Sequence, residues 1–313
     1  MDQQIRSRAI GCLLGQLSGD ALGSLVEFQT PQQICQRYPL GVREMRDGGT
    51  WNTIAGQPTD DSEMALALAR TLVAEGTYVQ DAARKVYADW LRSNPFDIGN
   101  TVRDGLDALP NHDSQANGAL MRIAPLGIFG AGLPLMQVGA WAEQDAVITH
   151  PHPVCRQINN LFARAISHAI ATGPTPRELY EAIRTWAKAL AVLPAVQDVI
   201  AAAEYTPPTD FTHQQGWVMI AFQNALFQLL NAPSLEEGVV RTIAGGGDTD
   251  TNAAIAGALL GAVHGEAAIP AQWRQSVLFC RPEQGRANVH RPRPQIYWPV
   301  DAVELAEQLV VTG

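Results

Sequence analysis

The chain has 313 residues, of which 46% are hydrophobic and 17% charged, and its 31 acidic against 22 basic side chains give a formal net charge of -9. This length supports one large domain or two small ones with a sizeable core, and the composition excludes disorder as the default state. The net negative charge disfavours sequence-independent binding to the phosphate backbone of a nucleic acid, so no nucleic-acid partner is expected. Acidic side chains gathered at one place would instead require a cation.

The four cysteines lie far apart and form no disulfide or zinc-binding spacing: Cys12, Cys35, Cys155 and Cys280. This usage is typical of a reducing compartment. The first residues do not form a secretory signal, and the longest apolar run, Ala253–Val263, is shorter than the roughly 20 residues that cross a bilayer. The sequence therefore predicts a cytoplasmic protein without a membrane span.

Apolar residues recur every three or four positions in several segments, which is the period of one face of a helix. This spacing predicts helices over Ile10–Leu17, Met64–Val73, Val86–Leu91, Ile158–Ile170, Leu179–Ala191, Trp217–Leu230, Ala253–Val263 and Val303–Val310. The segments rich in Gly, Pro, Asn and Asp are predicted as loops: Gly41–Gly49, Pro110–Gly118, Thr149–Pro153 and Thr206–Asp210. Because strand signals are scarce, we expect a single all-α domain whose ligand binds where loops and helix ends meet.

The first conspicuous loop is acidic and precedes a predicted helix. Residues 57–63 read Gln-Pro-Thr-Asp-Asp-Ser-Glu. Helix capping explains such a cluster well, because Asp, Ser and Thr are common N-caps and acidic side chains suit the positive end of the helix dipole. The alternative is that the carboxylates bind a ligand.

The second acidic cluster opens the helix predicted over Ala253–Val263. Residues 245–251 read Gly-Gly-Gly-Asp-Thr-Asp-Thr. Capping needs only one of these side chains, whereas the glycines allow a tight turn and the two aspartates can face one side. A nucleotide P-loop is disfavoured because no Lys follows the last glycine.

Together the two clusters supply oxygen ligands of the kind that Mg²⁺ and Mn²⁺ prefer. With water they suffice for two six-coordinate ions, and a two-metal site can hold adjacent substrate oxygens and activate water. The candidate ligands are Thr59, Asp60, Asp61, Asp248, Asp250 and Thr251.

Other polar residues lie in neighbouring loops, and each has a structural alternative. Glu27 either points into a site or is a solvated carboxylate at a helix end. Asp97 and Asn100 share one loop, in which Asn100 can also be a helix cap. These three residues are therefore functional candidates only if the fold places them next to a ligand site.

Two further loops carry candidate binding residues. Asn117 and Gly118 precede a predicted turn into a helix, whose free N–H groups could hold a phosphate. His150 and His152 face the same way on an extended segment, but without a third ligand they favour hydrogen bonding over zinc binding.

The order of these motifs is more specific than any one of them. In chain order they are residues 19–23 (Gly-Asp-Ala-Leu-Gly) with Glu27, residues 59–64 (Thr-Asp-Asp-Ser-Glu-Met), residues 117–122 (Asn-Gly-Ala-Leu-Met-Arg), Thr149-His150, and residues 246–251 (Gly-Gly-Asp-Thr-Asp-Thr). The set resembles the ADP-ribosylglycohydrolase family, closest to its branch of bacterial dinitrogenase reductase-activating glycohydrolases, which residues 97–100 (Asp-Ile-Gly-Asn) also resemble. The resemblance runs from about Ala9 to about Trp273.

This resemblance implies a compact all-α fold over residues 1–313 with a cleft that holds two divalent cations, Mg²⁺ or Mn²⁺. Residues 276–313 are expected to pack on it as an extension without an assigned role. The implied metal ligands are Thr59, Asp60, Asp61, Asp248, Asp250 and Thr251, with Asp250 as a bridge. The implied substrate-side positions are Glu27 beside the metals, Asn117 and Gly118 at the diphosphate, His150 on the substrate, and Asp97 and Asn100 near the leaving group.

The activity that the resemblance implies is metal-dependent hydrolysis of the N-glycosidic bond of ADP-ribosylated arginine on a protein, with release of ADP-ribose. Asp97 would pair with the guanidinium, and Glu27 or a metal-adjacent aspartate such as Asp61 would act as general acid or base. Two alternatives stay open: hydrolysis of O-linked ADP-ribose on serine or an acyl group, and a non-catalytic ADP-ribose-binding protein. We expect a monomer; the target protein is not determined by the sequence.

Overall fold

The computed structural model describes residues 2–313, and Met1 lies outside the described part. Within residues 2–313 the chain forms helices and no strand, with only two isolated β-bridges. The predicted all-α fold is confirmed. The α-helices are α1 (Gln3–Gly23), α2 (Pro31–Arg37), α3 (Asp60–Glu75), α4 (Gln80–Arg92), α5 (Asn100–Leu106), α6 (Ala124–Phe129), α7 (Leu135–Val147), α8 (Pro153–Thr172), α9 (Pro176–Ala189), α10 (Pro194–Ala202), α11 (Val218–Asn231), α12 (Leu235–Ala244), α13 (Thr249–His264), α14 (Ala271–Leu278) and α15 (Ala302–Thr312).

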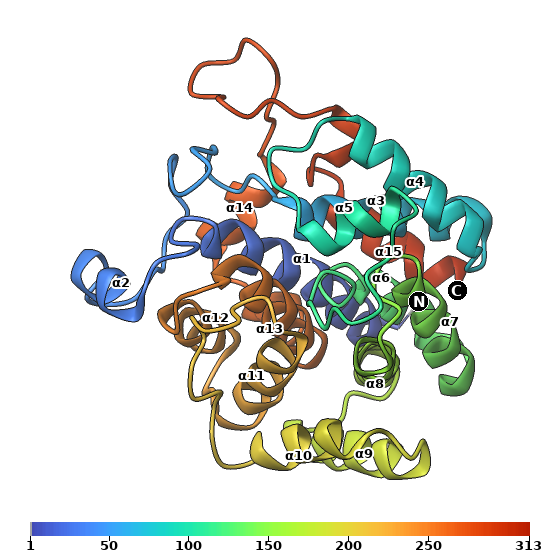
Figure 1. Cartoon of the computed structure of the whole chain (residues 1–313). Coiled ribbons are helices and arrows are strands. Elements are labelled where there is room, and N and C mark those ends of the chain that lie inside the picture. Colours follow the sequence, from blue (N-terminus) through green and yellow to red (C-terminus); the bar gives the residue numbers. More distant parts are fainter. Residues whose placement is uncertain (1) are drawn as a thin grey trace.

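Helices α1 and α13 lie side by side at the centre of the fold (Figure 1). Helix α1 carries a glycine every fourth residue from Gly11 to Gly23, so the glycines share one face. A Cβ atom added to Gly15 would lie 2.2 Å from the carbonyl oxygen of Gly257, and one added to Gly19 would lie 2.1 Å from that of Ala253. The two helices therefore touch backbone to backbone, which only glycine allows at these positions.

The other helices surround this central pair. Helices α11 and α12 pack on α13, α8 packs on α6 and α7, and α15 packs on α1, α3 and α6. One continuous hydrophobic cluster runs from Ala9 in α1 to Leu309 in α15, so the C-terminal helix shares the core with the first one. None of the helices within residues 2–313 has the length and apolar character needed to cross a membrane.

The long helices lie where apolar periodicity predicts them, whereas shorter ones were missed. Each of the eight predicted segments falls in or overlaps α1, α3, α4, α8, α9, α11, α13 or α15. The unpredicted helices are mostly of ten residues or fewer, too short to show several turns of a stripe. Helix α7 is longer, but several of its buried residues, such as Gly139, Ala142 and Ala146, are small and give a weak stripe.

The backbone contact between α1 and α13 is testable by adding one methyl group. We expect Gly19→Ala to lower the free energy of unfolding by about 1–3 kcal/mol, because the new Cβ must push the Ala253 carbonyl away. Urea denaturation measures this change. Gly132→Ala is the control, since no atom lies within 4 Å of its added Cβ. Equal stability of the two variants would contradict the proposed close packing.

Candidate active site

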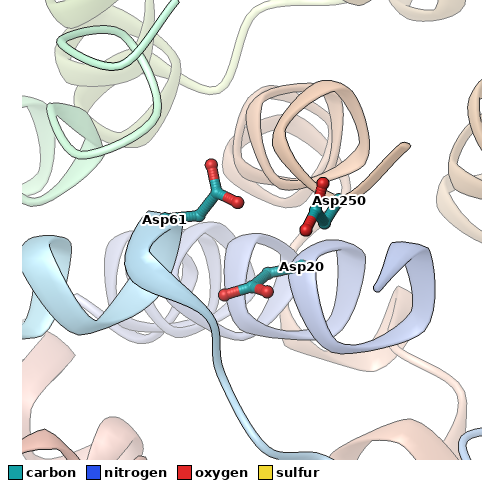
Figure 2. Close-up of side chains that lie close together, drawn as sticks. All are labelled: Asp20, Asp61 and Asp250. Carbon is teal, nitrogen blue, oxygen red and sulfur yellow. The ribbon is translucent and has the colours of Figure 1, made fainter. Parts of the chain in front are cut away.

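Three carboxylates meet where α1, α3 and α13 come together. Asp20 comes from α1, Asp61 from the first turn of α3 and Asp250 from the first turn of α13, and each offers an oxygen within 4.8 Å of the others. Figure 2 shows the three side chains gathered between their helices. All three are buried.

A second group of three carboxylates shares one member with the first. Glu27, Asp248 and Asp250 also offer oxygens within 4.8 Å of one another. Glu27 follows α1 and is 5% exposed, so it is not a solvated helix-end carboxylate. Asp250 therefore belongs to both acidic groups.

Asp20 holds the start of α3 in place. Its carboxylate accepts hydrogen bonds from the backbone N–H of Thr59, at 3.1 Å, and of Ser62, at 3.2 Å. The Thr59 hydroxyl lies 2.9 Å from Asp20 Oδ1 and 3.0 Å from Asp61 Oδ2. Asp20 thus caps α3 from another helix, although Thr59 makes no capping bond with its own side chain.

Two carboxylate oxygens in the centre lack a hydrogen-bond partner. Asp61 Oδ1 and Asp250 Oδ2 are fully buried and accept no hydrogen bond from any residue of the described chain, 2–313. An unpaired buried carboxylate oxygen is costly. Hard oxygen ligands converging from three helices are what a divalent cation requires, so these residues fit Mg²⁺ or Mn²⁺.

The carboxylates of this site hold their protons unusually strongly. Burial, followed by the charges of neighbouring carboxylates, raises the pKa of Asp60 to about 8 and the pKa of Glu27 and of Asp97 to about 9. The same causes raise the pKa of Asp61 and of Asp250 well above the usual range. Positive charge is needed to ionise the group at neutral pH, and no Lys or Arg in the described part of the chain lines this cavity.

The acidic groups open into a cavity of about 400 Å³. Thr59 and Asp61 are fully buried behind its wall. The residues assigned to the site from the sequence otherwise line it: Glu27, Asp60, Asp97, Asn100, Asn117, Gly118, His150, Asp248, Asp250 and Thr251. His152 does not line it, and its Nδ1 accepts a hydrogen bond from the Val154 N–H at the start of α8. The fold thus brings together residues that are more than 200 positions apart in the chain.

The Asn117 loop differs in detail from the expected phosphate-binding helix start. The N–H groups of Leu120 and Met121 donate to the Asn117 carbonyl, and the next helix begins only at Ala124. These two N–H groups are therefore not free to bind a phosphate. The Asn117 side chain instead donates to Asp248 Oδ2, at 2.7 Å, and so joins this loop to the acidic cluster.

His150 faces the cavity as a neutral donor. Arg122 donates to the Thr149 hydroxyl, at 2.9 Å, and that hydroxyl lies 2.7 Å from His150 Nδ1. Because Arg can only donate, we assign the buried Thr149 proton to the bond with Nδ1, which leaves the ring proton on Nε2. Burial, with the nearby Arg122 charge, lowers the pKa of His150 to about 3, so the ring is uncharged at neutral pH.

The comparison with known proteins decides the family. The sequence matches the family model for ADP-ribosylglycohydrolase over residues 1–305. The chain belongs to the ADP-ribosylglycohydrolase family. The resemblance inferred from the motifs is confirmed.

Several relatives match this chain over most of its length. It is 32% identical to the ADP-ribosyl-[dinitrogen reductase] glycohydrolase of Rhodospirillum rubrum, over 86% of this chain and 90% of that protein. It is 28% identical to the ADP-ribosylarginine hydrolase Tri1 of Pseudomonas putida (strain GB-1), over 88% and 76% respectively. A solved structure titled ADP-ribosylglycohydrolase-related protein complex matches with a TM-score of 0.81 and 26% identity, over 99% of both chains. Hydrolysis of ADP-ribosyl bonds is the activity that these comparisons support.

Sequence reasoning missed three residues of the site. Asp20 lies in the first of the ordered motifs, but no role was predicted for it, although it is the only acidic residue of α1. Trp51 Nε1 donates to Glu27 Oε2, at 2.5 Å, so the indole fixes this glutamate. Phe28 lines the cavity and is 54% exposed, with a φ of 64° that is unusual for a bulky residue.

The raised pKa values predict how this ADP-ribosylglycohydrolase responds to pH without metal. Between about pH 4, where unfolded carboxyls titrate, and about pH 9, the folded protein holds more protons than the unfolded chain. The free energy of unfolding therefore falls as pH rises. Urea denaturation with EDTA at about pH 6 and about pH 8.5 measures this fall, and added Mg²⁺ should reduce it. Equal metal-free stability at both pH values would contradict the prediction.

Proposed function

We propose that the protein hydrolyses the N-glycosidic bond between ADP-ribose and an arginine side chain of a protein, with two Mg²⁺ or Mn²⁺ ions bound at the acidic groups. The observation that carries this proposal is the pair of carboxylate groups sharing Asp250, beside a cavity that Asp97 also lines. The ADP-ribosylarginine hydrolase among the relatives supports the arginine linkage.

The ions would be held by the residues around Asp250. We assign Thr59, Asp60 and Asp61 to one side and Asp248 and Thr251 to the other. Ions held there would supply Lewis-acid chemistry, which can orient substrate hydroxyls and raise the acidity of a water molecule. Asp20 stays outside this set, because the N-terminus of α3 already occupies its oxygens.

Glu27 is our candidate for the proton transfers of hydrolysis. Trp51 fixes its carboxylate at the cavity wall, next to Asp250. In the overall reaction the bond from the ribose carbon to the guanidine nitrogen breaks, the carbon gains the hydroxyl of water, and the nitrogen gains its proton. A carboxylate that accepts a proton from water and returns it to the nitrogen completes this exchange.

The leaving group would be recognised by Asp97 and Phe28. A guanidinium is bound well by a carboxylate, through charge-assisted hydrogen bonds, and by the face of an aromatic ring. Both residues line the same cavity, and the Phe28 ring is exposed. Asn100 lies at the start of α5 and reaches the same cavity.

The ADP-ribose part of the substrate would be bound by an uncharged hydrogen-bond donor, in contrast to the carboxylate that would bind the guanidinium. His150 offers its Nε2–H, which has no partner within the described residues. Gly118 leaves room for that ring, since an added Cβ would lie 3.1 Å from its Cε1 atom and 2.8 Å from Val102 Cγ2. A neutral donor binds a substrate oxygen without pairing to the nearby carboxylates.

The first experiment is release of free ADP-ribose from an arginine-ADP-ribosylated protein and from a serine-ADP-ribosylated one, each with Mg²⁺, with Mn²⁺ and with EDTA. Metal-dependent release from arginine is the expected result. Release from serine alone would keep the metal site and overturn the linkage. Binding of ADP-ribose without release from either would place the protein in the non-catalytic class.

Asp97 provides a sharper test of the linkage. We expect Asp97→Asn to lower kcat/KM on the arginine-linked substrate roughly 10- to 100-fold, because a hydrogen bond to a charged group is lost. Steady-state kinetics measures the change. Asp104→Asn is the control, since this residue lies on the exposed face of α5. Unchanged kinetics of Asp97→Asn would argue against guanidinium recognition by this residue.

Asp250 tests whether two ions share one ligand. We expect Asp250→Asn to abolish both binding events in calorimetric titration with Mn²⁺, because Asp250 belongs to both carboxylate groups. The same variant should be more stable than the wild type without metal at about pH 8, because folding no longer has to protonate or bury a carboxylate that is ionised in the unfolded chain. Retention of two wild-type binding events would contradict the sharing.

A further inference from the structure

The segment between α14 and α15 contacts the active-site loops without lining the cavity. It comprises residues 281–298, the orange-red loop at the top of Figure 1, and we name it the C-terminal strap. The strap belongs to the extension for which the motifs give no role. Two of its arginines, Arg291 and Arg293, reach back to the loops on both sides of α3 and α4.

Arg291 binds the loop that carries Trp51. Its Nε donates to the Trp51 carbonyl, at 2.9 Å, and its own carbonyl accepts from Gln57 Nε2, at 2.6 Å. The Trp51 indole in turn donates to Glu27, and the adjacent Thr50 hydroxyl donates to the Glu27 carbonyl, at 2.9 Å. The strap is therefore two hydrogen bonds away from the Glu27 carboxylate.

Arg293 binds the start of the loop that carries Asp97. Its guanidinium is buried and donates to both oxygens of Glu63 in α3, at 2.7–3.1 Å. It also donates to the carbonyl and the hydroxyl of Ser93, at 2.9 and 2.7 Å. Ser93 follows the last residue of α4, and residues 93–99 lead from that helix to α5, with Asp97 among them. One side chain thus joins the helix of Asp61 to the loop of Asp97.

The strap is itself anchored on α3. Arg70 donates to the carbonyls of Ile296 and Trp298 and forms a two-point ion pair with Asp301. Trp298 Nε1 donates to the Arg293 carbonyl, at 2.8 Å. These bonds hold the two arginines against the same helix that begins with Asp60 and Asp61.

We propose that the C-terminal strap positions Glu27 and Asp97 for reaction, through Arg291 acting on Trp51 and Arg293 acting on Ser93. Both arginines are positioning residues, since neither lines the cavity. This inference rests on the proposed function where it assigns roles to Glu27 and Asp97. In this proposal the C-terminal strap contributes to catalysis by orienting active-site residues, in addition to packing on the rest of the fold.

The main test is Arg291→Ala in the full-length protein, because this side chain is exposed and its loss leaves the core intact. We expect kcat on the arginine-linked substrate to fall roughly 10- to 100-fold, since Glu27 loses its fixed orientation, while KM and Mn²⁺ affinity stay close to wild type. Hydrogen exchange of the amides in residues 47–57 should become faster. Arg291→Lys should restore part of kcat, because its ammonium can still donate to the Trp51 carbonyl.

Arg286→Ala is the matched control from the same strap. Among the described residues, the Arg286 side chain donates only to the Arg281 carbonyl within the strap, so its loss should leave kcat and exchange unchanged. Wild-type kcat together with wild-type exchange for Arg291→Ala would overturn the proposal. So would an equal loss of kcat in both variants, because the effect would then not depend on the contact with Trp51.

Arg293 requires a paired change, because its removal alone would leave Glu63 charged in the core and the protein could fail to fold. Arg293→Gln combined with Glu63→Gln removes both charges together. We expect faster exchange in residues 93–99 and a KM for the arginine-linked substrate raised about tenfold, because the Asp97 loop loses its anchor. A folded double variant with wild-type exchange and KM would overturn this part of the proposal.

Hydrogen exchange separates the failure of this inference from failure of the proposed function. If the wild type releases no ADP-ribose from any linkage, the proposed function fails, yet exchange in residues 47–57 and 93–99 still reports whether the strap orders these loops. If the wild type is active and the variants match it in rate and exchange, the strap has no positioning role.

Discussion

The direct backbone contact between α1 and α13 is the constraint on which the site depends. Because glycines of α1 face α13 from Gly11 to Gly23, the two helices approach more closely than side chains would allow. This approach places Asp20 of one helix beside Asp250 of the other, and the start of α3 then adds Asp61. A wider helix pair would separate Asp250 from Asp20, the residue that holds the start of α3 and with it Asp61.

The close packing has an electrostatic consequence. Burial and mutual repulsion raise the pKa of Glu27, Asp60 and Asp97 far above their usual values, so the folded chain alone favours protonated carboxyls. In the proposed function, divalent cations would replace those protons at neutral pH. The residues that would bind metal are then the same residues that lower the stability of the metal-free protein as pH rises.

Around the acidic centre, three functional side chains are held by hydrogen bonds to other side chains, two of them from distant parts of the chain. Trp51 fixes Glu27, Asn117 is tied to Asp248, and Thr149 sets the protonation of the His150 ring. The buried pair of Arg122 and Asp145 supports this last contact from behind. Such partners keep loops in one geometry, which a site made of loop residues requires.

The sequence by itself determined the long helices, because a stripe of apolar residues such as Met64, Leu68 and Leu72 is a local property of one helix. The ordered motifs around Asp60 and Asp248 also revealed the family. Only the tertiary structure decided that Asp250 belongs to two carboxylate groups, that Asp20 caps α3, and that Arg293 joins Glu63 to Ser93. These contacts link residues far apart in the chain, and no local pattern encodes a distance that depends on how whole helices pack.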